Sequence, residues 1–461
     1  MPRGFLSLVV EMHHRLPAPG RGPGGDWAVA ASGTYWPILK AIATAADAGA
    51  SEVLTLAVSP AWLALAADPT AQALARAELD RRADGGSDST GRWHELRRLV
   101  VDRWGGDPIA ALRRAHESGA VEVIPTTASP AWLPSVADSP VVARAQVALA
   151  AAEVEGVLGI AGKAGGIWLP HLSYRPGLED VIAESGPRYF GVAAEAFRRG
   201  TVRPPRDLFG PLITPPGAAA FGVDPEPTQL LTDRGRRFAR DPRYDDPRQA
   251  AEAVADHAQH FVTAWRESAE RRADRSESAP PISLAAVSAH DLGGDWGAGG
   301  DWLERTLLIL AAPSPWPATT PGRFLDRYPE GPVGLPGGAA GGLAAARPQD
   351  SDVLDRCREA ADLLADAVGR RDRHGPLGNR ALAQMARELL ASQALDWSGP
   401  PGSASELDPV EGLARAEGHL ARFAELAGLL LAGRLDPARL AALEAGPPYL
   451  ASLDPARLVP R

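Results

Sequence analysis

The sequence predicts an α/β fold in which a barrel-like domain is followed by an all-helical domain. Two observations lead to this prediction. Short apolar runs alternate with amphipathic helical stretches over the first three quarters of the chain, a pattern that is typical of parallel strands in a sheet or barrel. After roughly residue 348 only helical periodicity remains.

The individual elements follow from these patterns. Six short apolar runs have the length of buried parallel strands: Phe5–Val10, Val53–Val58, Val121–Ile124, Ile167–Leu169, Tyr189–Val192 and Ile282–Val287. Between them lie stretches with helical spacing, among them Pro108–Ser118, Val141–Leu158 and Arg248–Arg272. Glycine and proline predict loops at Thr201–Pro216 and Gly331–Arg347.

The last part of the chain carries apolar residues at helical spacing and no strand signal. The predicted helices are Val353–Arg370, Gly378–Ala394, Pro409–Ala432 and Pro437–Ala445. We therefore predict a first domain over residues 1–335 and a helical domain over residues 345–461.

Composition narrows the class of protein and its partners. With 461 residues, 45% of them hydrophobic, the chain can bury a large core. A net charge of -9 without a basic stripe predicts neither nucleic acid nor a membrane as partner. The single cysteine, Cys357, excludes an internal disulfide and fits a reducing compartment. The first apolar run is too short for a signal peptide, so we expect a cytoplasmic protein.

Polar residues stand where several predicted strands end. His171 comes directly after Ile167–Leu169 and Pro170, and α/β enzymes place their chemistry at such strand ends. His13, His14, His290 and Asp291 also lie near predicted strand ends. These side chains therefore belong to one candidate site at the mouth of the predicted barrel.

The flanks of His171 carry a family resemblance. The segment GIWLPHLSYRPGLE resembles the motif GIWLPECAYRPGLE of glycoside hydrolase family 57, in its 1,4-α-glucan branching enzymes. In the same order, LVVEMHHRLP resembles LVLHAHLP, PPISLAAVSAHDLGGDW resembles PPIVVAPYDAELFGHWW, and ARELLASQALDW resembles ARELLLAQSSDW. The resemblance spans essentially the whole chain. It implies a seven-stranded (β/α) barrel with a C-terminal helical domain that closes over the cleft.

The residues that match the family's two catalytic carboxylates are not carboxylates. Retaining glycosidases need a nucleophile and a general acid/base about 5 Å apart. The resemblance places His171 at the position of the nucleophilic glutamate and Ser288 at that of the aspartic acid/base. A serine hydroxyl has too high a pKa to protonate a leaving glycosidic oxygen. Our hypothesis is an α-glucan-binding or regulatory pseudoenzyme, or a protein partner of an enzyme of polysaccharide synthesis.

Two alternatives remain at this point. In the first, the chain is an active branching enzyme or glycosidase with a displaced acid: Ser288 and His290 face one way on a strand, but a bulge would turn Asp291 inward. In the second, His13, His171 and His290 hold a metal ion that assists carbohydrate chemistry. The sequence has no HxH or HxxxH spacing, and neighbouring His13 and His14 point opposite ways on a strand, so we expect neither a metal nor a cofactor.

The remaining candidates concern binding of an α-glucan or oligosaccharide. His13 matches the first histidine of the family's HAHLP, whereas Arg15 replaces the second. Trp168 and Trp296 have aromatic faces on which a sugar ring can stack, although a core position is the commoner use of tryptophan. Asp396 matches a family residue that contacts glucan from the helical domain, and Asp291 completes the predicted binding set.

Overall fold

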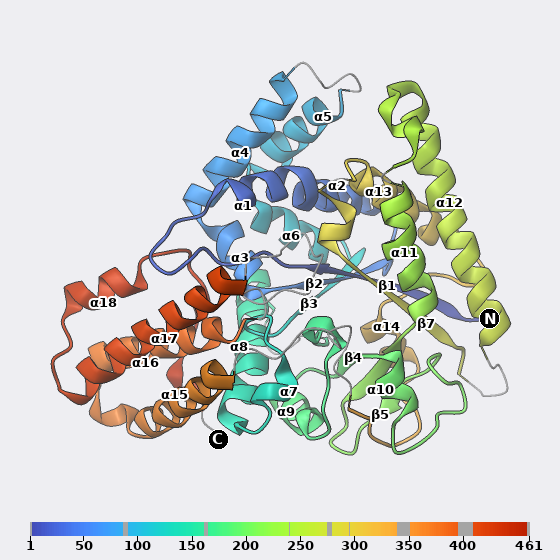
Figure 1. The fold of residues 1–461 in the computed structure, drawn as a ribbon. Coiled ribbons are helices and arrows are strands. Elements are labelled where there is room, and N and C mark those ends of the chain that lie inside the picture. The colour runs from blue at the N-terminus through green and yellow to red at the C-terminus, as the bar shows by residue number, and fades with distance from the viewer. Residues whose placement is uncertain are drawn as a thin grey trace.

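A computed structural model gives the fold of the chain. It describes residues 2–85, 91–160, 165–238, 240–273, 279–294, 296–338, 351–394 and 409–458. The strands are β1 (Phe5–Met12), β2 (Leu54–Val58), β3 (Val121–Pro125), β4 (Tyr189–Ala193), β5 (Leu212–Ile213), β6 (Ala219–Val223) and β7 (Ile282–Ser288). They lie at the centre of the molecule, and helices surround them (Figure 1).

The main strands form one curved parallel sheet in the order β3-β2-β1-β7-β6-β4. Residues 167–168 join its two edge strands. The Ile167 amide donates to the Tyr189 carbonyl of β4, and the Trp168 amide donates to the Pro125 carbonyl of β3, both at 2.9 Å. The sheet therefore curves into a ring of seven chain segments. β5 lies outside this ring and pairs antiparallel with β6.

The predicted strands compare well with this sheet. Five of the six apolar runs are strands, and Ile167–Leu169 contributes only a bridge, from Ile167 to Phe190. The sequence analysis missed β6, whose residues Ala219–Val223 read AAFGV, because alanine and glycine have low β propensity. It also assigned β5 to a loop. The seven-segment barrel itself is confirmed.

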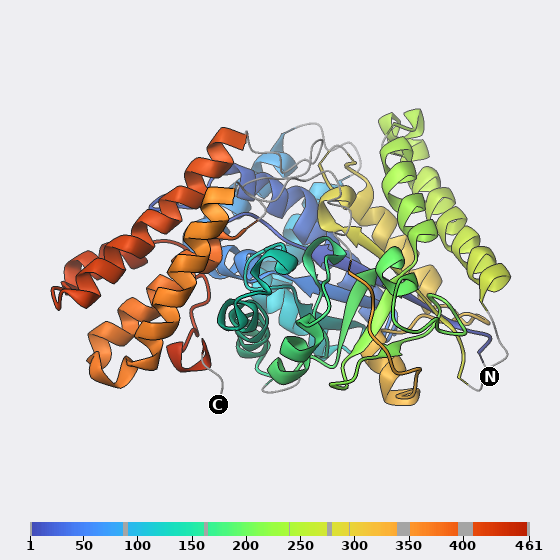
Figure 2. The ribbon, with the colours of Figure 1, turned by 60° about the horizontal axis from the view of Figure 1, so that its bottom comes forward.

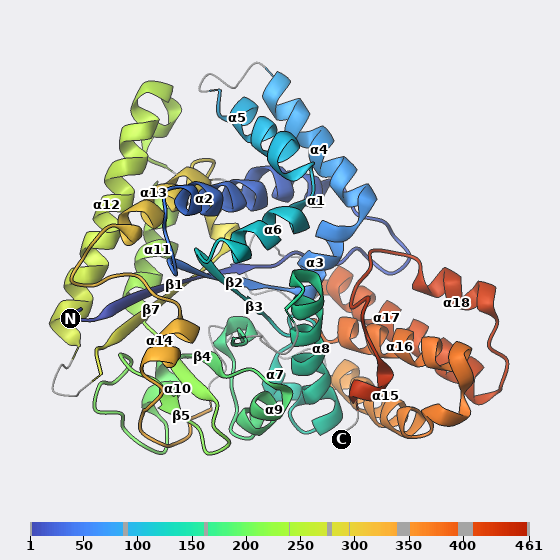
Figure 3. The same cartoon turned by 180° about the vertical axis from the view of Figure 1, so that it is seen from behind.

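Helices cover the outside of the ring (Figures 1 and 3). They are α1 (Gly25–Ala30), α2 (Trp36–Asp47), α3 (Pro60–Ala67), α4 (Pro69–Asp84), α5 (Arg92–Arg98), α6 (Pro108–Glu117), α7 (Leu133–Val136), α8 (Pro140–Leu158), α9 (Leu178–Ser185), α10 (Ala194–Arg198), α11 (Pro225–Phe238), α12 (Pro247–Arg272), α13 (Gly299–Ala311) and α14 (Pro321–Arg327). Short irregular helices add η1 (Ala31–Tyr35), η2 (Leu99–Arg103), η3 (Pro170–Leu172), η4 (Pro242–Asp245) and η5 (Ala289–Leu292). No helix in the described part of the chain combines the length and apolarity needed to cross a bilayer.

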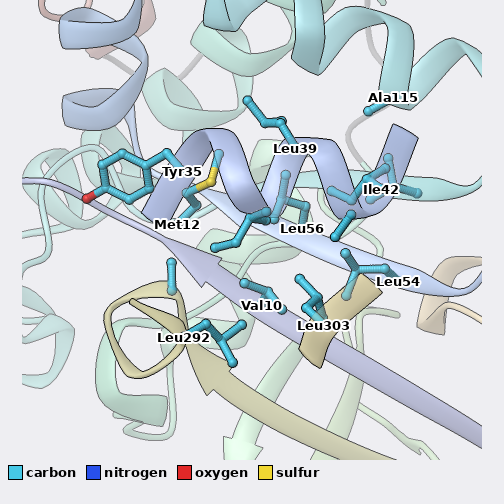
Figure 4. Packing of buried hydrophobic residues seen from close by; sticks show 14 of the residues in the cluster. Val10, Met12, Tyr35, Leu39, Ile42, Leu54, Leu56, Ala115, Leu292 and Leu303 are labelled. Atoms are coloured by element: carbon cyan, nitrogen blue, oxygen red, sulfur yellow. The ribbon is translucent and has the colours of Figure 1, made fainter. Parts of the chain in front are cut away.

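The two faces of each strand have different surroundings because side chains alternate along it. On β1, Val10 and Met12 point outward and pack with Leu39 and Ile42 of α2 (Figure 4). Phe5 and Val9 instead belong to the cluster that fills the ring. The same alternation fixes which strand-end residues face the inside of the ring.

The helical region confirms the predicted change of pattern. Its elements are α15 (Ser351–Gly369), η7 (Arg371–Arg373), α16 (Gly375–Ser392), α17 (Pro409–Leu431), α18 (Pro437–Glu444) and η9 (Pro455–Leu458). It stands on one side of the barrel, opposite α12 (Figure 2). Its apolar residues, such as Met385 and Leu389, belong to the same buried cluster as Val142 and Leu149 of α8. The two regions therefore share a hydrophobic core.

Hydrogen bonds also connect the helical region to the barrel. The Tyr449 hydroxyl donates to the Ala128 carbonyl, which lies in the loop after β3, at 2.8 Å. The Ser452 hydroxyl donates to Glu153 of α8, also at 2.8 Å. These contacts join residues about 300 positions apart and hold the loop after β3 against the bundle.

Glu388 of α16 is the centre of a buried polar cluster in the helical region. Its side chain is 4% exposed and lies 2.6 Å from His419 Nδ1. Arg422 Nε donates to it at 2.7 Å and Gln384 Nε2 at 2.8 Å. Burial alone raises the pKa of Glu388, but the hydrogen bond from His419 and the charges of His419 and Arg422 hold it below its ordinary value. The residue is thus an ionised carboxylate at neutral pH.

Candidate active site

A carboxylate lies at the mouth of the barrel where β1 ends. Glu11 shares the inward face of β1 with Val9, because the two residues are separated by a full period of the strand. In the sheet register Glu11 pairs with Ala57 of β2 on one side and with Ser288 of β7 on the other. The inward face of β1 therefore brings Glu11 directly beside the position matched to the family acid/base. Our sequence analysis did not identify Glu11 as a site residue.

The loop after β1 is held by hydrogen bonds to neighbouring elements. His13 Nδ1 lies 2.8 Å from Ser59 Oγ, which also accepts the Trp62 amide at 3.1 Å and so caps the start of α3. The Tyr35 hydroxyl donates to the His13 carbonyl at 2.6 Å. These contacts fix His13 at the mouth.

His14 is buried next to the same tyrosine. Its Nδ1 lies 3.0 Å from the Tyr35 hydroxyl, whose one proton is directed to the His13 carbonyl, so Nδ1 is the donor. Burial lowers the pKa of His14, although Asp26, 3.8 Å from Nε2, opposes this shift. The imidazole is therefore neutral at pH 7.

His13 and His14 both line one cavity, which corrects our prediction that only one of them faces the cleft. β1 ends at Met12, so the strand's alternation no longer applies to the two histidines. The cavity, which we call the mouth cavity, has a volume of about 490 Å³. Its lining residues are His13, His14, Arg15, Gly25, Asp26, Val29, Ala30, Gly33, Thr34, Arg82, Arg92, Trp93, His290, Gly294 and Gly297.

His171 lies on the other side of the barrel mouth. It belongs to η3, which follows the segment that bridges β3 and β4, on the opposite arc of the ring from β1 and β7. Both His171 and Leu172 have positive φ, 54° and 56°, a conformation that non-glycine residues rarely adopt and that concentrates at functional sites. Leu172 packs against the cluster inside the ring. His171 is not among the residues that line the mouth cavity.

The end of β7 turns sharply after Ser288. Its hydroxyl accepts the His290 amide at 3.3 Å and starts the turn η5. Because the chain leaves the strand here, the alternation that we used for positions 288–291 stops at Ser288. His290 lines the mouth cavity together with His13, whereas Asp291 does not.

The two tryptophans predicted to stack on sugar are core residues in this structure. Trp168 is 3% exposed and packs over Gly191 inside the ring. Trp296 is 4% exposed, with its ring centroid 5.4 Å from that of Trp302. The aromatic residue at the mouth cavity is Trp93, which the sequence analysis missed because it lies in a charged helix. Asp396 lies outside the described residues.

The metal hypothesis finds no ligand set in the described residues. No group of three or more His, Cys, Asp or Glu side chains among them is placed to hold a metal ion. His13 and His290 share the mouth cavity, but His171 belongs to the far arc of the ring. The structure thus separates the three histidines that the hypothesis brought together.

Comparison with known proteins agrees with this architecture. A family model described as glycosyl hydrolase family 57 matches residues 68–220, and one described as the C-terminal region of 1,4-alpha-glucan branching enzymes matches residues 356–457. A 1,4-alpha-glucan branching enzyme of Thermococcus kodakarensis is 25% identical over 86% of this chain and 69% of its own length. A probable 1,4-alpha-glucan branching enzyme of Mycobacterium tuberculosis is 27% identical over 95% of this chain and 94% of its own.

Solved structures share the fold over the full chain. The α-amylase AmyC of Thermotoga maritima superposes with a TM-score of 0.85 at 20% identity and covers 100% of this chain and 99% of its own. The branching enzyme of Thermococcus kodakaraensis gives a TM-score of 0.83 at 23% identity, covering 100% and 97%. The fold is thus a (β/α)7 barrel with a helical C-terminal region, shared with these structures. The chain is thus similar to glycoside hydrolase family 57 and resembles its glucan branching enzymes.

Proposed function

We propose that this chain is an α-glucan-binding member of family 57 that no longer carries out the family's double displacement. The observation that carries the proposal is the pair His171 and Ser288 at the positions matched to the two catalytic carboxylates. The two residues lie on opposite arcs of the barrel mouth, where a substrate would pass between them. An imidazole and a hydroxyl in these places supply neither the covalent carboxylate intermediate nor the acid that retention requires.

The retained architecture supports binding rather than chemistry. The barrel and the helical region are both formed and share a hydrophobic core. The barrel also has the mouth cavity. A protein that binds glucan without converting it would act on the polymer through a partner enzyme. We therefore include in the proposal a protein partner in α-glucan synthesis, and a cytoplasmic location in which Cys357, buried in the shared core, stays reduced.

A direct assay tests this proposal. We expect the purified chain to bind maltooligosaccharides in calorimetry and to form no new α-1,6 ends from amylose. The double variant His171→Glu with Ser288→Asp supplies both carboxylates and is the matched gain-of-function control. If the unaltered chain forms new α-1,6 ends and the variant His171→Ala does not, the proposal is wrong.

Glu11 favours a second candidate function, a slow glycosidase with a displaced acid. Its carboxyl stands beside Ser288 in the sheet register, on the inward face, within one strand spacing of the position matched to the family acid. In this role Glu11 would protonate the leaving glycosidic oxygen. Glu11 replaces Asp291 as the displaced acid that we considered from the sequence, because Glu11 lies within β1 in register with Ser288, whereas Asp291 lies in the turn η5 beyond the end of β7.

Substitution of Glu11 separates the two functions. If the second candidate is right, any hydrolysis of maltooligosaccharides is expected to fall by about 100-fold or more in Glu11→Gln, the size of a general-acid contribution. Sugar binding should persist, since the amide keeps the shape of the side chain. Asp291→Asn is the matched control, and a loss of turnover there instead of in Glu11→Gln would exclude Glu11.

A further inference from the structure

The mouth cavity is rich in arginine. Its charged lining residues are Arg15, Arg82, Arg92 and Asp26, so three positive charges and one negative give the lining a formal charge of +2 with the histidines neutral. The arginines come from three separate elements, namely the loop after β1, α4 and α5. A neutral glucan carries no charged group with which these arginines could form ion pairs.

Each of the three guanidinium groups is held in place from the side. Arg82 Nε donates to Glu78 Oε1 at 2.9 Å, and Arg92 donates to the Gly297 carbonyl at 2.6 Å and lies 3.6 Å from Asp301. Arg15 lies 3.8 Å from Asp26. The arginine side chains are only 20–30% exposed. Neighbouring groups therefore orient the guanidinium groups at the cavity wall before any ligand arrives, which lowers the entropic cost of binding.

Two of these arginines lie over one aromatic ring, that of Trp93. The Arg92 guanidinium is 4.3 Å from the centre of the Trp93 ring, and that of Arg82 is 5.0 Å from it. The Arg82 nitrogens also lie over Gly33, where a Cβ would be 3.2 Å away, so the absence of a side chain leaves them room. The wall thus presents guanidinium groups suited to an anion, and two of them are supported by the aromatic ring.

We propose that the mouth cavity binds a saccharide that carries a phosphate ester. This inference rests on the proposed glucan binding and specifies its ligand. A phosphate monoester carries a charge of about -1.5 to -2 at pH 7, and guanidinium groups, of which the lining has three, recognise phosphate oxygens in bidentate geometry. The rings of His13 and His290 provide hydrogen-bonding groups for sugar hydroxyls on the same cavity. A carboxylated sugar shares the anionic chemistry but carries only one charge.

Calorimetry on the full chain tests the inference with four probes, glucose 1-phosphate, glucose, glucuronate and inorganic phosphate. Maltotriose, measured in parallel, tests the proposed function. We expect glucose 1-phosphate to bind at least about ten-fold more tightly than each of the other three, as for charge-assisted hydrogen bonds. This preference should weaken as salt is raised. It should also disappear in Arg82→Gln and in Arg92→Gln. Arg103→Gln, which removes an exposed arginine outside the cavity that pairs with Asp47, is the matched control and should keep the preference.

The other outcomes each contradict a defined part of the proposal. Equal binding of glucose and glucose 1-phosphate overturns the inference, while retained maltotriose binding would leave the proposed function standing. Glucuronate binding as tightly as glucose 1-phosphate excludes the phosphate ester as the preferred group. If inorganic phosphate binds as tightly as glucose 1-phosphate, the cavity is an anion site that does not recognise the sugar, which contradicts the proposal. If maltotriose does not bind but glucose 1-phosphate binds tightly, the proposed glucan-binding function is contradicted, whereas the proposed recognition of a phosphate ester is not.

Discussion

Replacing Glu388 with alanine is expected to lower the free energy of unfolding by about 3–5 kcal/mol. The change leaves His419 and Arg422 without the carboxylate that they share in the interior of the helical region. Urea denaturation followed by circular dichroism measures this loss. Glu425→Ala is the matched control, because Glu425 pairs with Arg439 at the surface and its loss should have little effect.

The same carboxylate gives the stability a pH dependence. Since the pKa of Glu388 lies below the ordinary value of 4.5, its contribution is fully present above about pH 4.5 and is lost as the pH falls through the folded-state pKa. The acid limb of the stability curve should therefore flatten in Glu388→Gln. An unchanged acid limb in this variant would contradict the role assigned to Glu388.

Replacing Asp224 with alanine is expected to lower the free energy of unfolding by about 1.5–3 kcal/mol, the range for hydrogen bonds to a charged group. Asp224 follows β6, is 1% exposed and receives two hydrogen bonds from Arg272 of α12, at 2.6 and 3.0 Å. It also accepts the Ser283 hydroxyl of β7 at 3.0 Å. Removing it would loosen α12 from the sheet where β6 and β7 meet.

Thermal unfolding of Asp224→Ala measures this effect. The matched control is Asp47→Ala, which removes a carboxylate that is 56% exposed and binds Arg103 at the surface. We expect the melting temperature to fall clearly in the first variant and to change little in the second. Equal shifts in the two variants would show that burial of Asp224 does not matter.

Much of the fold followed from periodicity, and the exceptions have physical causes. Buried parallel strands are recognised by continuous apolar runs, as in β1 and β7. The sequence analysis did not predict β6 because alanine and glycine occupy three of its five positions. Ile167–Leu169 reads as a strand but makes only a bridge, since Pro170 ends the extended segment immediately after it.

The candidate site was harder to predict because it lies where regular structure ends. The strand's alternation correctly predicts the direction of side chains within β1, and it would have identified Glu11, which shares the parity of Val9. Beyond Met12 and Ser288 the chain turns, so alternation wrongly predicted that only one of His13 and His14 faces the cleft, and it no longer applies to His290. Trp93 meets Arg82, and both share the mouth cavity with Arg15, only through tertiary packing, which a single sequence does not encode at short range.

The hydrogen bonds that join Tyr449 to Ala128 and Ser452 to Glu153 have a consequence for the order of events during synthesis. Contacts over such separations form late, because the intervening chain must first be ordered. The strands and helices of the barrel leave the ribosome long before residues 449–452 do. The helical region therefore completes its contacts with this loop and with the apolar face of α8 only after those residues emerge.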